Sequence, residues 1–234
     1  MKVGIMQPYL FPYIGYWQLI NAVDRFVILD DVNFIMRGYI NRNSILLNGK
    51  PYRFIIPMQK ASQNKLIKET KLNYSQEEKN KFFLTLYNAY KKAPYYEEAM
   101  PLIEDIINNS ETDLTKYIQL SIERIMNYLG VETEIYISSQ IEKKQTLKGE
   151  ERIIEICKRI NADTYINPCG GRALYNHIHF AREGIELFFL ETRDNIIYNQ
   201  KQEEFVGNLS IIDILMFNDV QTIKKFLKEY ELKK

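Results

Sequence analysis

The first thirty residues alternate between apolar runs and polar turns in an order typical of an α/β protein. Residues 3–6 form a short apolar run that predicts a buried strand almost at the N-terminus. Two prolines follow and lead the chain out of the sheet, because proline has no backbone N–H to donate to a neighbouring strand. Residues 16–22 then show a helical pattern, and residues 25–29 form a second apolar run. The pattern predicts a strand, a turn, a helix and a second strand.

A hairpin and a helical block are expected next. Asn48-Gly49 lies between the apolar runs 44–47 and 52–56, and this dipeptide is a strong signal for a tight hairpin turn. From about residue 76 to residue 130 the apolar side chains repeat at three- and four-residue steps. This is the period of an amphipathic helix.

Proline, glycine and aspartate divide this block into three predicted helices. Pro94 ends the first, and Pro101 suits the first turn of the second, where a missing N–H costs nothing. Asp113 is the expected N-cap of the third helix, residues 114–129, and Gly130 terminates it.

Strands and helices alternate again in the last part of the chain. Such alternation predicts a mainly parallel sheet flanked by helices. We expect a single α/β domain over residues 1–234, with a helical subdomain inserted at about residues 76–130. The expected strands of the last part are residues 134–138, 164–167 and 185–190, and the expected helices are residues 150–160, 174–183 and 211–217.

Composition and charge narrow the functional classes. Of the 234 residues, 46% are hydrophobic and 26% charged, as in an ordinary globular protein. The formal net charge of +1 gives no bulk attraction to nucleic acid. No apolar run approaches the roughly 18–20 residues that span a bilayer. The N-terminus lacks a signal-peptide pattern, and the two cysteines fit a reducing compartment. We therefore expect a cytoplasmic protein with no nucleic acid partner and no membrane insertion.

Tyrosine is unusually frequent, with 17 residues in the chain. Its flat apolar face and its hydroxyl group suit a pocket for a polar, ring-shaped ligand. A core in which every hydroxyl has a partner explains the same count, so both interpretations stay open.

Polar residues follow the ends of several predicted strands. In an open α/β sheet ligands bind outside the carboxyl ends of the strands, so these residues are candidates for a site. Asp30 and Asp31 follow the second strand, and because adjacent strand residues point to opposite faces they cannot form a facing acid pair. One of them can bind an amine, a hydroxyl or a metal while the other caps the next loop. A turn with Asx hydrogen bonds is the alternative.

Two further segments are candidates for binding an anion. Arg37 and Arg42 carry the guanidinium fork that binds phosphate bidentately, although solvated arginines give the same pattern. Residues 167–172 follow a predicted strand, and Gly170 and Gly171 would let backbone N–H groups approach an anion at a helix N-terminus. A plain strand-to-helix turn is the alternative here.

Cys169 lies where a nucleophile could lie, and His177 and His179 follow it closely. Spacing alone pairs neither histidine with Cys169, so the sequence provides no assured base for a thiol nucleophile. The two histidines and two cysteines form no recognisable metal-ligand spacing. We expect no metal site, and we expect activity to be retained without the Cys169 thiol.

Short polar and aromatic motifs are spread along nearly the whole chain. They are Gln7-Pro8-Tyr9, Phe11-Pro12-Tyr13-Ile14-Gly15-Tyr16, Asp30-Asp31-Val32, Asn41-Arg42-Asn43, Lys92-Ala93-Pro94-Tyr95, Tyr165-Ile166-Asn167, Gly170-Gly171, Leu174-Tyr175 and Asn208-Leu209-Ser210-Ile211-Ile212-Asp213. Together these motifs resemble the WbqC-like family. The resemblance implies a role in the biosynthesis of bacterial surface polysaccharides, where transfer of glycine or another acyl group to a sugar has been suggested for some members.

From this resemblance we expect a transferase that forms an amide between an acyl or aminoacyl donor and an amino sugar carried on a nucleotide. The substrate is then a sugar nucleotide, the expected donor an acyl thioester, and an acyl carrier a candidate partner. The alternative is a non-catalytic protein of the same pathway that binds a sugar nucleotide or a partner. The sequence identifies neither the donor, the sugar nor the general base.

Such a reaction needs an anion site, a group that handles the amine, and donors for a developing oxyanion. Because parallel strands present their carboxyl ends at one edge, the N-terminal and C-terminal motifs are expected to meet there. Arginine and the glycine pair would bind the anion, an aspartate would handle the amine, and tyrosines would wall the pocket. The expected site comprises Asp30 and Asp31 as catalytic residues and Gln7, Tyr9, Tyr13, Tyr16, Arg42, Asn167, Gly170 and Gly171 as substrate-binding residues.

Overall fold

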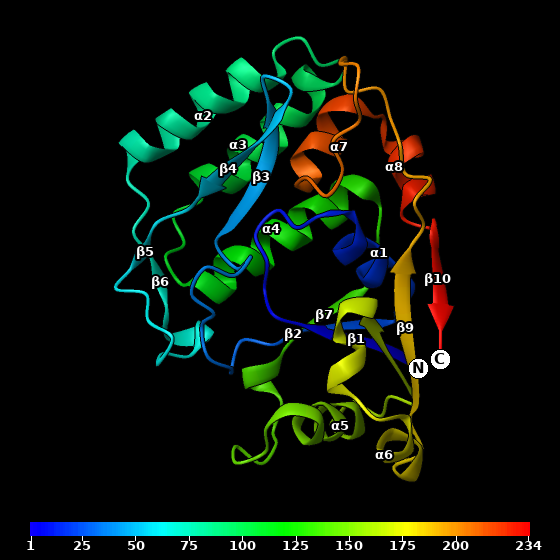
Figure 1. The fold of residues 1–234 in the computed structure, drawn as a ribbon. Helices are drawn as coiled ribbons and strands as arrows, with labels where there is room; N and C mark the ends of the chain where they lie inside the picture. Colours follow the sequence, from blue (N-terminus) through cyan, green and yellow to red (C-terminus); the bar gives the residue numbers. More distant parts are fainter.

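A six-stranded mixed sheet forms the centre of the molecule in a computed structural model that describes residues 1–234. Five strands are parallel, and β10 alone runs antiparallel to its neighbour β9 (Figure 1). Helices flank the sheet, so the α/β class predicted from the sequence is confirmed. The strand order is β10 (Tyr230–Lys233), β9 (Glu186–Thr192), β8 (Thr164–Pro168), β1 (Lys2–Met6), β2 (Arg25–Ile28) and β7 (Glu134–Ile137).

The order in which the chain adds strands reverses next to β1. From β1 the chain adds β2 and β7 on one side, and it then returns to place β8, β9 and β10 on the other. Such a reversal leaves a crevice at the carboxyl ends of the neighbouring parallel strands, where ligands bind in open α/β sheets. The fold therefore favours a site at the carboxyl ends of β1 and β8.

Both faces of the central strands are buried, which explains their nearly continuous apolar sequence. One face packs into a cluster of 13 buried residues, to which α5 (Gly149–Arg159) and α6 (His177–Arg182) contribute. The other face packs into a cluster of 40 buried residues, which includes side chains of α1 (Ile14–Ala22).

The connection from β2 to β7 begins with the predicted hairpin. The strands β3 (Arg42–Leu47) and β4 (Lys50–Ile55) are antiparallel, so the Asn48-Gly49 signal is confirmed. Both turn residues are left-handed, with φ of 52° at Asn48 and 73° at Gly49, as a two-residue hairpin turn requires.

Three helices follow in the same connection: α2 (Gln76–Tyr90), α3 (Tyr96–Asn108) and α4 (Leu114–Leu129). The helix α4 has its predicted bounds, with Asp113 as a side-chain N-cap and Gly130 left-handed at φ 63°. The buried hydrophobic side chains of all three helices belong to the 40-residue cluster shared with α1 and β2. Between the hairpin and α2 lie the short strands β5 (Met58–Gln59) and β6 (Lys71–Leu72) and a 3₁₀ turn, Ile67–Glu69.

The predicted start of α3 at Pro101 is wrong, because the helix begins at Tyr96 and Pro101 lies inside it. Proline removes one backbone hydrogen bond from a helix interior. Residues on both sides of it, Ala99, Met100 and Ile103, are buried in the 40-residue cluster and continue the helix through the proline. Tertiary packing therefore outweighs the local signal.

The predicted helix over residues 174–183 is also wrong in extent. A 3₁₀ helix, Cys169–Leu174, comes first, and α6 begins only at His177. Asn176 separates the two, because its side chain accepts a hydrogen bond from the N–H of Ile178 and caps α6. The last helices are α7 (Ile211–Phe217) and α8 (Val220–Phe226).

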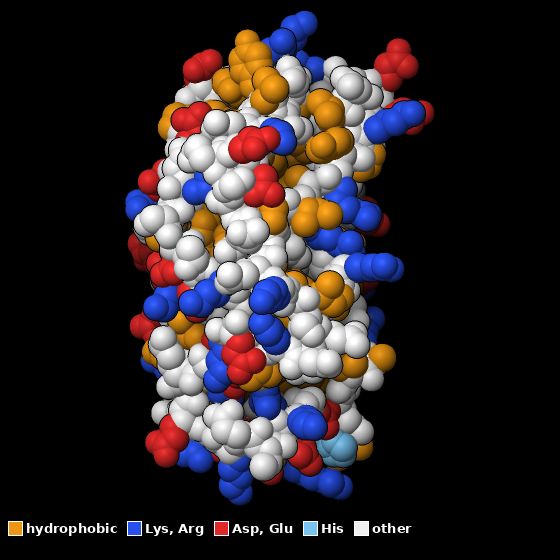
Figure 2. Space-filling model, turned by 90° about the vertical axis from the view of Figure 1, so that its left-hand side faces the viewer, with side chains coloured by type: hydrophobic (Ala, Val, Ile, Leu, Met, Phe, Trp, Pro, Cys, Tyr) orange, Lys and Arg blue, Asp and Glu red, His pale blue; other side chains and the backbone are white.

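Charge is dispersed over the face of the molecule shown in Figure 2. Lys and Arg side chains are interspersed there with Asp and Glu, in line with the formal net charge of +1. None of the helices is long and apolar enough to cross a membrane.

Candidate functional site

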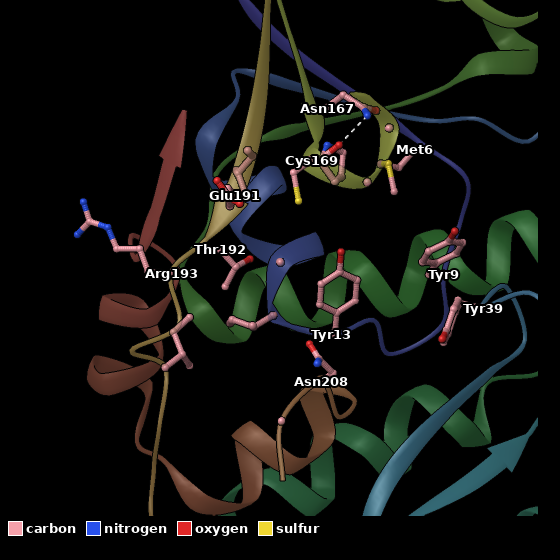
Figure 3. A pocket seen from close by; sticks show the side chains of 18 of the residues that line it. Met6, Tyr9, Tyr13, Tyr39, Asn167, Cys169, Glu191, Thr192, Arg193 and Asn208 are labelled. Atoms are coloured by element: carbon pink, nitrogen blue, oxygen red, sulfur yellow. Dashed lines mark hydrogen bonds between the residues drawn. The ribbon is translucent and has the colours of Figure 1, made fainter. Parts of the chain in front are cut away.

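A cavity of about 830 Å³ opens outside the carboxyl ends of β1, β8 and β9, where the strand order reverses. Of its 29 lining residues, 17 are hydrophobic. This volume and this largely apolar lining are typical of sites for small molecules. The cavity, shown in Figure 3, is therefore the candidate functional site.

Four stretches of chain that are far apart in sequence build most of the cavity. The first contributes residues between 5 and 15, at the end of β1 and in the turn that follows. The second is the end of β8 with the turn that follows it, residues 167–175, and the third is the end of β9 with the two residues after it, residues 190–194. The fourth is the segment 196–209, which leads to α7. Ile35 and Tyr39 add a further part of the wall.

The two ends of the cavity differ in chemistry. Tyr9 and Tyr39 lie at one end, with ring centroids 6.1 Å apart. Thr192 and Arg193 lie at the other end (Figure 3). Tyr13 lies between them, with its hydroxyl directed toward the turn after β8 (Figure 3). The cavity thus offers an aromatic surface at one end and polar and charged groups at the other.

The turn after β1 is fixed through the carbonyl group of Phe11. This residue is left-handed, with φ of 46°, and its side chain is fully buried. Its carbonyl oxygen accepts hydrogen bonds from Asn43 Nδ2 at 2.7 Å and from Ser210 Oγ at 2.8 Å. The next carbonyl, that of Pro12, accepts from Trp17 Nε1 at 3.1 Å. The turn is thus tied to β3, to α1 and to the start of α7.

Three tyrosines, two in this turn and one in the first turn of α1, have different environments. Burial, together with the neighbouring Tyr9 and Cys169, raises the pKa of the Tyr13 hydroxyl, which therefore stays protonated at neutral pH and can donate a hydrogen bond. Tyr16 is fully buried and donates to the carbonyl of Gln7 at 3.0 Å. Tyr9 stacks on the ring of Tyr16 at 5.6 Å. Tyr16 therefore supports the wall without reaching the cavity.

The first turn of α1 faces the cavity without a side-chain cap. Ile14 and Gly15 line the cavity, and Tyr13, at the N-cap position, makes no capping hydrogen bond. A Cβ on Gly15 would lie 2.6 Å from the Tyr13 ring and 2.9 Å from Thr192 Oγ1, so only glycine fits. Free N–H groups and the positive end of the helix dipole favour an anion at such a point.

The turn after β8 is shaped by Asn167, which is buried. Its Oδ1 accepts a hydrogen bond from the hydroxyl of Tyr165, and its Nδ2 donates to the carbonyl of Pro168, both at 2.9 Å. A Cβ on Gly171 would lie 2.0 Å from this Nδ2, whereas a Cβ on Gly170 would have no atom within 4 Å. Packing therefore requires glycine at 171, while Gly170 leaves the backbone open to the cavity.

The two aspartates after β2 lie at the carboxyl edge of the sheet but outside the cavity. Asp30 accepts hydrogen bonds from the N–H and the hydroxyl of Ser139, at 2.8 and 2.7 Å. Asp31 forms an ion pair with Lys143 at 2.8 Å, with both side chains 1% exposed. Burial by itself would raise the pKa of Asp31, but hydrogen bonds from Lys143 and Ser138 lower the pKa below its ordinary value. Both carboxylates therefore hold the segment after β7.

The structure brings most of the expected site residues into the cavity. The turn after β1 and the turn after β8 meet there, as the parallel sheet predicts. Arg42 begins β3, where it pairs with Ile55, and does not reach the cavity. Of the expected residues, Gln7, Tyr9, Tyr13, Asn167, Gly170 and Gly171 line the cavity, and Asp30, Asp31, Tyr16 and Arg42 do not.

Two parts of the cavity have no counterpart among the sequence-based predictions. Residues 191–194 come directly after a predicted strand, so the rule that sites lie beyond strand ends would have found them. The segment 196–209 has no periodic pattern and contains no familiar motif before Asn208, so the sequence gives no signal for its place in the wall.

Cys169 is exposed at the cavity, but neither histidine lines it. His177 packs edge-on against Phe189, with ring centroids 5.6 Å apart, and His179 contacts Glu150. The cavity therefore pairs this thiol with no histidine base. No group of three or more His, Cys, Asp or Glu side chains is placed to hold a metal ion.

The fold and the cavity define an α/β protein with a candidate small-molecule site at a topological switch point. The chain belongs to the WbqC-like protein family, whose model matches residues 7–225. It is also similar to a Mycobacterium tuberculosis protein named "Uncharacterized protein Rv1507c", with 26% identity over 215 residues and 92% of each chain covered. No solved structure matches the chain. The family match includes the turn after β1, the turn after β8 and the segment 196–209.

The replacement Gly171→Ala is expected to lower the free energy of unfolding by about 1–3 kcal/mol, because the added methyl group overlaps the Asn167 side chain. The matched change Gly170→Ala is expected to stay within about 0.5 kcal/mol of the original chain, because its methyl group meets no atom. Denaturant unfolding of both variants measures the difference. Equal losses would contradict the packing role of Gly171.

The replacement Asp31→Asn is expected to lower the free energy of unfolding at neutral pH by about 3–5 kcal/mol, because it leaves the Lys143 ammonium buried without its partner. Since folding lowers the Asp31 pKa, the contribution of this carboxylate is complete above its unfolded pKa of about 4. It is lost as pH falls through the folded pKa. Unfolding curves at several pH values should show this acid-dependent component in the original chain only. Wild-type stability of the variant at pH 7 would refute the role of the ion pair.

Proposed function

We propose that this protein is a cytoplasmic transferase of bacterial surface glycan biosynthesis. In this proposal it forms an amide between an acyl or aminoacyl donor and a nucleotide-linked amino sugar. The observation that supports it most is the cavity itself, in which the uncapped first turn of α1 lies between an aromatic end and a polar end. The pathway and the reaction class follow from what the family resemblance implies.

The cavity offers a place for each part of a sugar nucleotide. The anionic diphosphate would lie against the first turn of α1 and the open backbone at Gly170. The base or the sugar ring would stack on Tyr9 and Tyr39 at the aromatic end. The amino group would then lie near the middle of the cavity, beside Tyr13.

The reaction joins the amine nitrogen to the carbonyl carbon of a thioester. The C–N bond forms, the C–S bond breaks, and the proton lost by the nitrogen ends on the departing thiolate. The Tyr13 hydroxyl is placed to donate a hydrogen bond to the oxyanion that develops on the carbonyl oxygen. Asp194 lines the cavity, and its carboxylate forms no ion pair. We infer that this carboxylate first accepts the amine proton.

Asp194 takes this role in place of the two aspartates expected from the sequence. The carboxylate oxygens of Asp30 and Asp31 are engaged by Ser138, Ser139 and Lys143 outside the cavity. A carboxylate whose oxygens are held in buried hydrogen bonds has little capacity left for a substrate.

The same engagement favours a second candidate function, a non-catalytic protein that binds a sugar nucleotide. Turnover separates the two candidates. The chain is incubated with UDP-glucosamine and a panel of acyl and glycyl thioesters, and mass spectrometry detects any amide product. A transferase is expected to release thiol and to form the amide. Calorimetric binding of the nucleotide without any amide product would favour the second candidate.

The replacement Tyr13→Phe is expected to lower turnover about 100-fold, the usual scale for losing one donor to an oxyanion. Its free energy of unfolding is expected to change by less than about 0.5 kcal/mol, because no hydrogen bond of the fold involves this hydroxyl. Thiol release and amide formation measure turnover. The matched change Tyr136→Phe, on β7 and outside the cavity, is the control. Equal turnover in the two variants would remove the Tyr13 hydroxyl from the reaction.

The replacement Cys169→Ala is expected to retain most of the activity, because no histidine base lies beside the thiol. The same turnover assay tests this expectation, with circular dichroism as the check on the fold. A loss of about 100-fold or more in a folded variant would show that the thiol takes part in the reaction.

A further inference from the structure

A buried carboxylate lies behind the wall of the cavity and has no cation beside it. Asp213 of α7 is fully buried. Its Oδ1 accepts a hydrogen bond from the hydroxyl of Tyr90 at 2.8 Å. Its Oδ2 accepts from the hydroxyl of Tyr198 at 2.7 Å and from Gln200 Nε2 at 2.8 Å. Burying a carboxylate is costly unless it is hydrogen-bonded, and these three donors offset that cost.

The donors come from two different parts of the chain. Tyr198 and Gln200 belong to the segment 193–210, which joins β9 to α7 and contains no helix or strand. Tyr90 ends α2 and does not line the cavity, and its hydroxyl also accepts from the N–H of Leu46 at 3.1 Å. One side of Asp213 therefore faces the cavity wall, and the other faces the helical block.

The hydrogen bonds continue from Asp213 through Gln200 to the outer part of the wall. Gln200 Nε2 also donates to the carbonyl of Val206 at 2.9 Å, and Gln200 Oε1 accepts from the N–H of Val206 at 2.8 Å. The preceding residue, Phe205, packs edge-on against Tyr198 with ring centroids 5.1 Å apart. Both Tyr198 and Phe205 line the cavity.

We propose that Asp213 is a positioning residue, which holds the segment 193–210 in the shape that forms one wall of the cavity. It acts through the Tyr198 hydroxyl and the Gln200 amide and touches no ligand itself. The wall is thereby formed before a ligand binds. This inference holds for any small molecule that the cavity takes, so it does not depend on the proposed transfer reaction.

Two matched tyrosine variants separate this role from a general contribution to stability. Tyr198→Phe and Tyr90→Phe each remove one hydroxyl donor from the same carboxylate, but only the first loosens the wall. Native-state hydrogen exchange of peptides from residues 196–209 is the readout, because the Val206 N–H is protected by the Gln200 side chain. Exchange there should rise about tenfold or more in Tyr198→Phe and stay within about twofold in Tyr90→Phe.

A second variant and a binding measurement test the same inference independently. Gln200→Leu cuts the same path to Val206 and should also raise exchange over residues 196–209 about tenfold. Calorimetric titration with UDP-glucosamine should give a Kd raised about threefold or more in Tyr198→Phe and unchanged in Tyr90→Phe. If the original chain does not bind this nucleotide, the proposed function fails, while hydrogen exchange still decides the role of Asp213. Equal exchange in Tyr198→Phe and Tyr90→Phe, or no rise in Gln200→Leu, would overturn the inference.

Discussion

The buried carbonyl group of Phe11 is the point on which the site depends. A left-handed backbone costs a residue other than glycine about 1–3 kcal/mol. At Phe11 this cost is offset by a fully buried side chain and by two buried donors, Asn43 Nδ2 and Ser210 Oγ. Because these donors belong to β3 and to the residue before α7, the turn after β1, the hairpin and the C-terminal helices are locked together. The turn carries Tyr9 and Tyr13, so this lock also sets one side of the cavity.

Buried aspartates fix the loops around the carboxyl edge of the sheet. Asp30 and Asp31 hold the segment after β7, and Asp213 holds the wall that follows β9. Polar residues near such an edge can either bind a ligand or stabilise the loops around it. In this protein the most buried carboxylates stabilise the loops. The groups left to meet a ligand are backbone N–H groups of α1, tyrosine rings and hydroxyls, and the less buried side chains at the end of β9. The cavity is thus a preformed space with few charges of its own.

Local signals in the sequence predict the parts of this structure that local forces decide. The bounds of α4 follow from its apolar period and its two caps, and the hairpin follows from Asn48-Gly49. The start of α3 does not follow from a local signal. Buried residues on both sides of Pro101 continue the helix through the proline. The two turns that were expected to meet at one sheet edge both line the cavity, because parallel strands present their carboxyl ends at the same edge. The sequence could not show what Asp30 and Asp31 contact, because their partners lie in a segment more than 100 residues further along the chain.

The rate at which iodoacetamide alkylates Cys169 tests most directly whether the cavity is the ligand site. Cys169 is exposed at the cavity and Cys157 is buried, so alkylation of the folded chain reports on Cys169 alone. Saturating UDP-glucosamine is expected to slow this alkylation about tenfold or more, because a nucleotide in the cavity blocks access to the thiol. A nucleotide that binds by calorimetry but leaves the alkylation rate unchanged would place the ligand elsewhere on the molecule and contradict the assignment of the cavity.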